Sequence, residues 1–204
     1  MTTPRLRTWV AAAALLLAMS GARTIAQEPH DKRTVRPHAS GEVKTFAHSS
    51  DAYGVEHPSD WQAHERGERT NIGPDDGLVA GERGFRTIYG VIVQVAADPL
   101  AGQPDRSLEA SARLIVEQVL KRNPHQALKE PLTRDKPLAG APAYHAVING
   151  TSPVTGLGER AEIVVRQHGE GQVLYLVLVS PIDHFASLEA PLRRVRDSLR
   201  MPAR

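Results

Sequence analysis

Apolar and polar residues alternate between residues 159 and 166, where alanine, isoleucine and valine stand at positions 161, 163 and 165. This period of two is typical of a β-strand with one buried face. Residues 173–179 are apolar or aromatic throughout, so we expect a strand that is covered on both faces. The segment 168–171 between them contains two glycines, which adopt the positive φ angles of hairpin turns without strain. The pattern therefore predicts an antiparallel hairpin.

An amphipathic helix is predicted directly after this hairpin, over residues 183–200. Pro181 ends the strand because proline has no N–H to donate, and Asp183 is the expected N-cap of the helix. Apolar residues then recur at spacings of three and four, which places them on one face of the helix. They are Phe185, Leu188, Leu192, Val195 and Leu199.

A second amphipathic helix is predicted over residues 107–122. Ser107 is its expected N-cap, and Asn123 with Pro124 ends it. The nearly apolar segment 88–97 precedes it and predicts a second central strand, in which Gly90 indicates a bulge or a close packing approach.

Shorter strands are predicted elsewhere, because brief alternating segments are separated by turn residues in the manner of an antiparallel meander. These segments are 45–48, 53–57, 62–65, 69–73, 126–130 and 143–149. Two nearly all-apolar strands need cover on both sheet faces, and the two amphipathic helices are the obvious cover. The sequence therefore predicts an α+β domain with a mainly antiparallel sheet between helical layers.

The start of the chain has the pattern of a removable signal peptide. Arg5 and Arg7 precede an apolar run over residues 9–19, which is shorter than the roughly 20 residues that cross a bilayer. Small residues then offer cleavage after Ala22 or Ala26. Cleavage is favoured over a retained amphipathic anchor, so we expect an exported protein, periplasmic or secreted, with no membrane span in its mature form.

We expect three parts: the signal peptide 1–26, a flexible lead-in 27–43 and a single domain 44–204. Three of the 25 basic residues lie in the first part, so the rest carries 22 basic and 23 acidic residues, a net charge of −1. A nearly neutral domain is a poor candidate for binding nucleic acid or anionic lipid. The sequence has no cysteine, which excludes disulfides, thiolate chemistry and lipid attachment at a cleavage-site thiol.

Several phrases resemble PsbP-like domains in their order along the chain. Residues 53–61 (YGVEHPSDW) are similar to that family's aromatic-x-x-x-x-P-x-x-W opening, and Ile72-Gly73-Pro74 and Gly140-Ala141-Pro142-Ala143 match later phrases. Residues 175–200 are similar to its closing strand and helix. The resemblance implies an α/β/α sandwich of the exported bacterial type that is sometimes joined to membrane-associated zinc peptidases. It implies no shared catalytic residues, and family members are mostly accessory or assembly proteins.

Nine histidines raise the question of a metal site, with His57, His64, His145 and His168 near turns or strands. Zinc needs three or four converging ligands, and no pair here has the i,i+4 spacing of a helix or the i,i+2 spacing of a strand. Residues 64–68 begin like the zinc peptidase motif HExxH but lack its second histidine. Surface histidines are therefore the favoured interpretation, and no cofactor is expected.

Other chemical motifs are weak. The sequence has no Gly-x-Ser-x-Gly elbow, no Ser-x-x-Lys motif and no glycine loop that opens a helix. Arg193, Arg194, Arg196 and Arg200 could recognise phosphates or acidic partners, but a solvated helix face is the favoured interpretation. We therefore expect no enzymatic activity, and a hydrolase is the weakest of the functions considered.

The segment Pro74–Arg86 is the most promising functional surface, because it is longer than a typical hairpin connection of about two to five residues. The possible partner surface within it consists of Asp75, Asp76, Leu78, Val79 and Phe85. The two aspartates also suit a simple turn, and the apolar residues also suit packing over the sheet edge. The leading hypothesis is an exported accessory domain that binds another cell-envelope protein. The alternative is a small-molecule or metal-binding module with a pocket near this segment.

Overall fold

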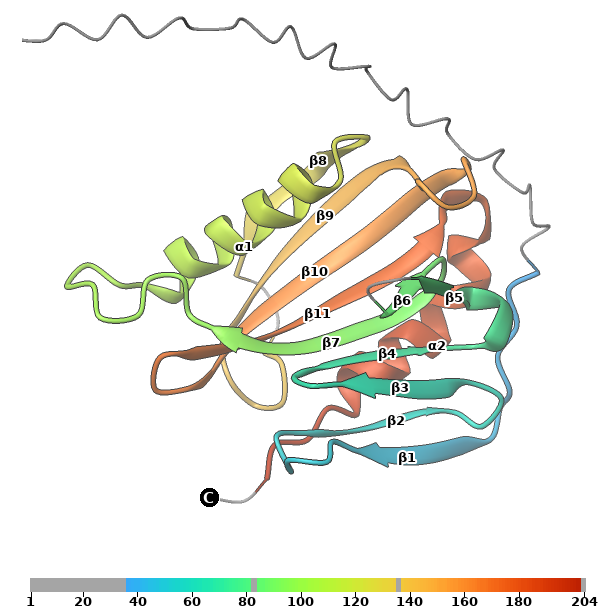
Figure 1. The fold of residues 1–204 in the computed structure, drawn as a ribbon, viewed down its shortest axis with the longest axis horizontal. Coiled ribbons are helices and arrows are strands. Elements are labelled where there is room, and N and C mark those ends of the chain that lie inside the picture. Colours follow the sequence, from blue (N-terminus) through green and yellow to red (C-terminus); the bar gives the residue numbers. More distant parts are fainter. Residues whose placement is uncertain (1–35, 82–83, 135–136, 203–204) are drawn as a thin grey trace, which may run out of the picture.

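The computed structural model describes residues 36–81, 84–134 and 137–202. Within them a seven-stranded antiparallel sheet has the order β3-β4-β7-β11-β10-β9-β8 (Figure 1). Its strands are β3 (Gln62–Arg66), β4 (Arg69–Gly73), β7 (Gly90–Ala97), β8 (Gln126–Thr133), β9 (Ala143–Thr151), β10 (Gly158–Gly169) and β11 (Gln172–Pro181). The predicted α+β class is therefore confirmed.

The two nearly apolar strands, β7 and β11, are neighbours near the centre of this sheet, as their composition predicts. Gly90 begins β7 with a φ of +136°, and a Cβ atom there would lie 2.2 Å from the carbonyl oxygen of Ile72. The close approach that the sequence indicates is therefore real, and only glycine satisfies it.

Two helices cover opposite faces of the sheet: α1 (Leu108–Arg122) lies in front in Figure 1 and α2 (Phe185–Asp197) lies behind. Ala112, Ile115 and Val116 of α1 share one buried cluster with residues of β9, β10 and β11. Leu188, Leu192, Val195 and Leu199, at α2 and just beyond it, join a second cluster around Trp61 and the opposite side of the central strands. This is the predicted α/β/α sandwich. No helix in the described part of the chain is long and apolar enough to cross a membrane.

The sequence predicts the N-cap of α1 correctly, but not the N-cap of α2. The Ser107 hydroxyl accepts a hydrogen bond from the backbone N–H of Ala110 at 3.1 Å, which is the expected N-cap. Asp183 does not cap α2. It lies inside a 3₁₀ turn, Ile182–His184, and His184 is the residue at the N-cap position, without a side-chain hydrogen bond. The extra turn after Pro181 moves the helix start by two residues.

The first two strands, β1 (Val43–Ala47) and β2 (Gly54–Pro58), form a hairpin of their own. The meander expectation is wrong here, because this pair does not join the main sheet. Its free edge instead meets the end of α2: backbone bonds join Gly54 and Arg200 in both directions, and the Ser198 hydroxyl accepts from the N–H of Glu56 at 2.8 Å.

The long segment Pro74–Arg86 is not an irregular connection. It contains a 3₁₀ turn, Asp75–Gly77, and a hairpin formed by β5 (Leu78–Gly81) and β6 (Gly84–Thr87). The hairpin is tied to the sheet by Asn71 of β4, whose amide donates to the Thr87 hydroxyl at 2.9 Å. Two strands of four residues, each with a glycine at one end, are too short for their alternation to stand out in the sequence.

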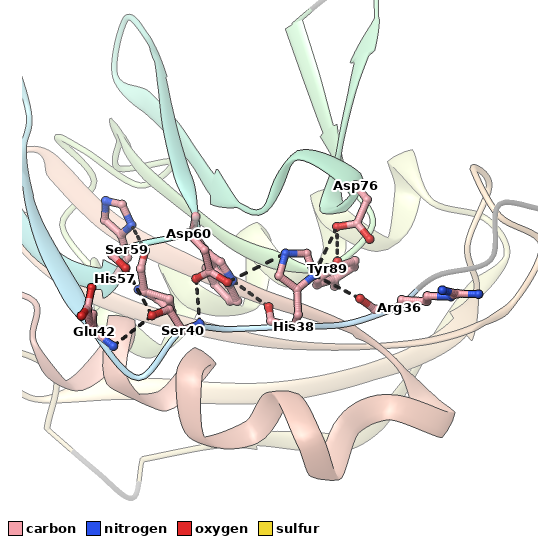
Figure 2. A network of polar contacts seen from close by, with 11 residues as sticks. Arg36, His38, Ser40, Glu42, His57, Ser59, Asp60, Asp76 and Tyr89 are labelled. Carbon is pink, nitrogen blue, oxygen red and sulfur yellow. Dashed lines mark hydrogen bonds and ion pairs between the residues drawn. The ribbon is translucent and has the colours of Figure 1, made fainter.

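Residues 36–42, the described end of the predicted lead-in, lie against the domain (Figure 2). The indole N–H of Trp61 donates to the carbonyl of His38 at 3.0 Å, and the backbone N–H of Ser40 donates to Asp60 at 2.8 Å. The His38 ring lies between two carboxylates, 3.8 Å from Asp60 and 3.9 Å from Asp76. The predicted signal peptide lies outside the described residues.

Candidate functional site

A groove of about 410 Å³ lies on the face of the sheet that carries α1. Helix α1 packs over β8, β9 and β10, whereas the β5–β6 hairpin contacts β4 and β7. The central strands β7 and β11 are left partly open between these two walls. The volume lies within the range of about 300–1,000 Å³ that is usual for small-molecule sites.

The floor of the groove is aliphatic, because strand pairing aligns apolar side chains on this face. Val177 of β11 pairs with Ile92 of β7, and Ala161 of β10 pairs with both Val179 and Ile148. All five residues line the groove. This arrangement explains why β11 is apolar on both faces: one face packs under α2, and the other forms the groove floor.

Three arginines from three different elements border this floor: Arg69 of β4, Arg86 of β6 and Arg122 at the end of α1. Among the described residues, none of the three has a carboxylate within 4 Å. Elsewhere Arg106 and Arg113 do have such partners, at 2.7 Å and 3.0 Å. The described lining of the groove therefore carries three arginines and one acid, Glu159, beside an apolar surface.

Arg69 is the most enclosed of the three. Its Nε donates to the Asn71 side-chain oxygen at 3.1 Å, which fixes the guanidinium at the groove wall. Burial lowers the pKa of Arg69, Tyr175 raises it, and the nearby positive charge of Arg122 lowers it further. Because the ordinary value is 12.5, Arg69 stays charged at neutral pH.

Tyr175 places a phenol in the same groove. Its hydroxyl donates to the Gln94 side-chain oxygen at 2.8 Å across the β7–β11 pair. Burial raises the pKa of Tyr175, so the hydroxyl is neutral at physiological pH.

Glu159 of β10 closes one end of the groove and is 7% exposed. Its carboxyl group accepts hydrogen bonds from the side chains of Gln126 and Ser152. Burial outweighs these bonds and raises the pKa of Glu159 to about 7. Sequence reasoning missed this residue, although a signal was available: position 159 shares its strand face with Ala161, which predicts a buried acid.

The predicted partner residues are not gathered on one surface. Leu78 is buried, Val79 packs against the core cluster below α2, and the Phe85 ring stacks on His64 with centroids 4.0 Å apart. Asp75 and Asp76 are both exposed, and Asp76 accepts a hydrogen bond from the Tyr89 hydroxyl (Figure 2). Among the described residues of this segment, 74–81 and 84–86, Arg86 is the one that lines the groove. The partner surface stays a prediction.

The interpretation of the histidines as surface residues is wrong for His48, His57 and His145, which are all buried. His57 Nδ1 lies 2.9 Å from the Pro58 carbonyl oxygen, and burial lowers the pKa of the ring. His145 Nδ1 lies 3.4 Å from a carboxylate oxygen of Glu162. No group of three or more histidine, aspartate or glutamate side chains within the described ranges is placed to hold a metal ion.

The solvated-face interpretation of the last helix is wrong for Arg196. Its side chain is 10% exposed, and it contacts Glu162 at 3.1 Å and Asp197 at 2.7 Å. A hydrogen bond from His145 and the charge of Arg196 hold the pKa of Glu162 below its usual value, against the effect of burial. Arg193 and Arg194 are exposed as expected.

A wider depression of about 730 Å³ lies near the β10–β11 turn. The turn residues Ser50 and Asp51, and Met201 beyond α2, border it. Its arginine, Arg166, already donates to the carbonyl groups of Leu138 and Ala139 at 3.1 Å and 3.2 Å. That guanidinium holds the neighbouring loop, so the groove between α1 and the hairpin is the stronger candidate site.

No protein-family model matches the sequence, and no curated protein is similar to it in sequence. The solution structure of cyanobacterial PsbP (CyanoP) from Synechocystis sp. PCC 6803 is similar in fold, with a TM-score of 0.53 and 11% identity, covering 81% of this chain and 95% of that one. The structure of LpqN from Mycobacterium tuberculosis, involved in cell envelope biogenesis, matches with a TM-score of 0.47 and 15% identity. The match covers 79% of this chain and 91% of LpqN. The structure of PA94 from Pseudomonas aeruginosa, a putative regulator, matches with a TM-score of 0.44 and 13% identity. The match covers 80% of this chain and 99% of PA94. The chain therefore has the PsbP-like fold that its sequence predicts.

Proposed function

We propose that this protein is an exported, non-enzymatic binding domain, and that the groove between α1 and the β5–β6 hairpin holds a small molecule. The observation that carries the proposal is the combination of an aliphatic floor with three arginines that lack a carboxylate partner among the described residues. Sites of this kind bury an apolar ligand body and orient it by a few polar groups. The signal-peptide pattern of residues 1–26 supports export.

A cell-envelope protein as partner is the second candidate. It is supported by Phe85, which is only half-buried on the hairpin, and by the exposed carboxylate of Asp75. The inward position of Leu78 favours the small-molecule site over this alternative.

Filling the groove should abolish ligand binding. Val177 forms part of the floor, so Val177→Trp places a large ring where the ligand body would lie. Leu128→Trp is the matched control, because Leu128 is exposed on the edge strand β8. A panel of small apolar acids, alcohols and amines is screened by ligand-observed NMR, with circular dichroism as the check on folding.

We expect compounds that bind the native protein and the Leu128→Trp variant to lose their signal with Val177→Trp. For a confirmed compound, a concentration of 100 times its dissociation constant should stabilise the native protein against thermal unfolding by about 2.7 kcal/mol. Equal binding by a folded Val177→Trp variant, or no binding by any compound, would contradict the proposal.

A further inference from the structure

We infer that the ligand of this groove is a single small amphiphilic anion, with an acid group at the arginines and an aliphatic body on the sheet floor. The inference rests on the proposed function and names the chemical class of its ligand. Two properties of the groove carry it: the sign of the charge along its border and the shape and chemistry of its floor.

The border charge selects an anion. Arg69, Arg86 and Arg122 come from a strand, a hairpin and a helix end, so the fold itself brings three cations to one place. The acid among the groove residues is Glu159, which is buried at one end and hydrogen-bonded to Gln126. A charged guanidinium beside a low-dielectric floor binds a carboxylate or phosphate more strongly than it would in open water.

A second group of arginines supports the inference that the border of the groove attracts an anion, because the arginines of that group are paired with carboxylates. Arg160, Arg193 and Arg196 also surround a hollow, of about 300 Å³, on the other face of the sheet. Each of them contacts a carboxylate within 4 Å: Glu130, Glu189 and Glu162 respectively. The arginines of that hollow are thus paired with carboxylates, whereas the three arginines of the groove have no such partner among the described residues.

The floor selects an aliphatic body. Its aliphatic residues run from Ile92 of β7 across Val177 and Val179 of β11, and Ala161 and Ile148 beyond them are 2% and 1% exposed in the cluster that includes α1. Its residues are aliphatic, and the one aromatic residue in the groove lining, Tyr175, has its hydroxyl bound to Gln94. An alkyl chain fits this strip, whereas a nucleobase would find no pair of aromatic rings between which to stack among the described lining residues.

Three probes with the same ten-carbon chain test the inference: decanoate, decanol and decyltrimethylammonium. Binding to the full protein is measured by isothermal titration calorimetry below the micelle concentrations. We expect decanoate to bind at least ten times more tightly than decanol, and the cationic probe to show no binding. Equal affinities for decanoate and decanol would overturn the inferred ligand class while leaving groove binding intact. Failure of all three probes would count against the proposed function as well.

Charge-neutralising variants locate the acid group. Arg86→Gln combined with Arg122→Gln changes two exposed residues, and Arg69→Gln is examined separately. Decanoate affinity should fall toward that of decanol in each variant, with decanol affinity unchanged. Arg113→Gln, on the exposed face of α1, is the control and should leave both affinities unchanged. Unchanged decanoate affinity in the folded double variant would overturn the inference.

Vesicles of phosphatidylglycerol form the last arm, because the same arginines could meet an anionic membrane surface. We expect no co-sedimentation of the native protein with these vesicles. Co-sedimentation that the double variant abolishes would assign the arginines to a lipid surface and would overturn the single-molecule ligand.

Discussion

Replacing Glu159 by glutamine is expected to stabilise the protein at pH 8 by about 3 kcal/mol and to change little at pH 4. The pKa of this carboxyl group is raised by burial from 4.5 to about 7. Between these two values the Glu159 carboxyl group holds a proton in the folded protein that it has lost in the unfolded chain. The contribution of Glu159 to the free energy of unfolding therefore falls as the pH rises. Above pH 7 the folded state contains a buried negative charge, and the neutral glutamine removes that cost.

Urea unfolding of both proteins at pH 4, 6 and 8 measures the effect. The free energy of unfolding of Glu159→Gln minus that of the native protein should be close to zero at pH 4 and should grow as the pH rises to 8, because the other titrating groups are the same in both proteins. Glu117→Gln, an exposed position on α1, is the control and should follow the native protein. Parallel curves for the native protein and Glu159→Gln would show that Glu159 does not titrate as a buried group.

Replacing Arg196 by alanine is expected to lower the free energy of unfolding by about 3 kcal/mol. The substitution leaves the Glu162 carboxylate at the sheet without its cation, and that carboxylate is only 21% exposed. Arg193→Ala removes a guanidinium from the same helix, but one that forms an exposed i,i+4 pair with Glu189. Surface pairs of this type contribute about 0.5 kcal/mol or less.

The comparison of these two variants by urea unfolding at neutral pH separates the buried pair from ordinary surface charge. Adding Glu162→Gln to Arg196→Ala should recover part of the loss, because the unpaired charge is then removed. Equal stability of Arg196→Ala and Arg193→Ala would mean that the contact with Glu162 contributes nothing.

The elements with strong periodicity could be predicted from the sequence. The spacing of Leu188, Leu192 and Val195 predicts the buried face of α2, and β7 and β11 were identified as central strands by their lack of polar residues. These predictions succeed because burial on one or both faces imposes a period on the chain itself. The resemblance to PsbP-like domains also predicts the α/β/α sandwich that these elements form.

The features that depend on tertiary geometry could not be predicted in the same way. Arg196 reads as a surface residue because its partner, Glu162, lies on a strand far away in the sequence. The groove arises because α1 covers one side of the sheet and the hairpin the other, and no local pattern reports the width left between them. Arg69, Arg86 and Arg122 are therefore unremarkable in the sequence and become a group only in the fold.

The central claim is that the groove between α1 and the β5–β6 hairpin binds a small amphiphilic anion. Its most direct test is a titration of the isotope-labelled protein with decanoate, followed by backbone amide NMR. We expect the largest shift changes at residues that line the groove, which include Ile92, Arg122, Glu159, Tyr175, Val177 and Val179. Changes centred instead on the β10–β11 turn near His168, or the absence of any saturable change, would contradict the account.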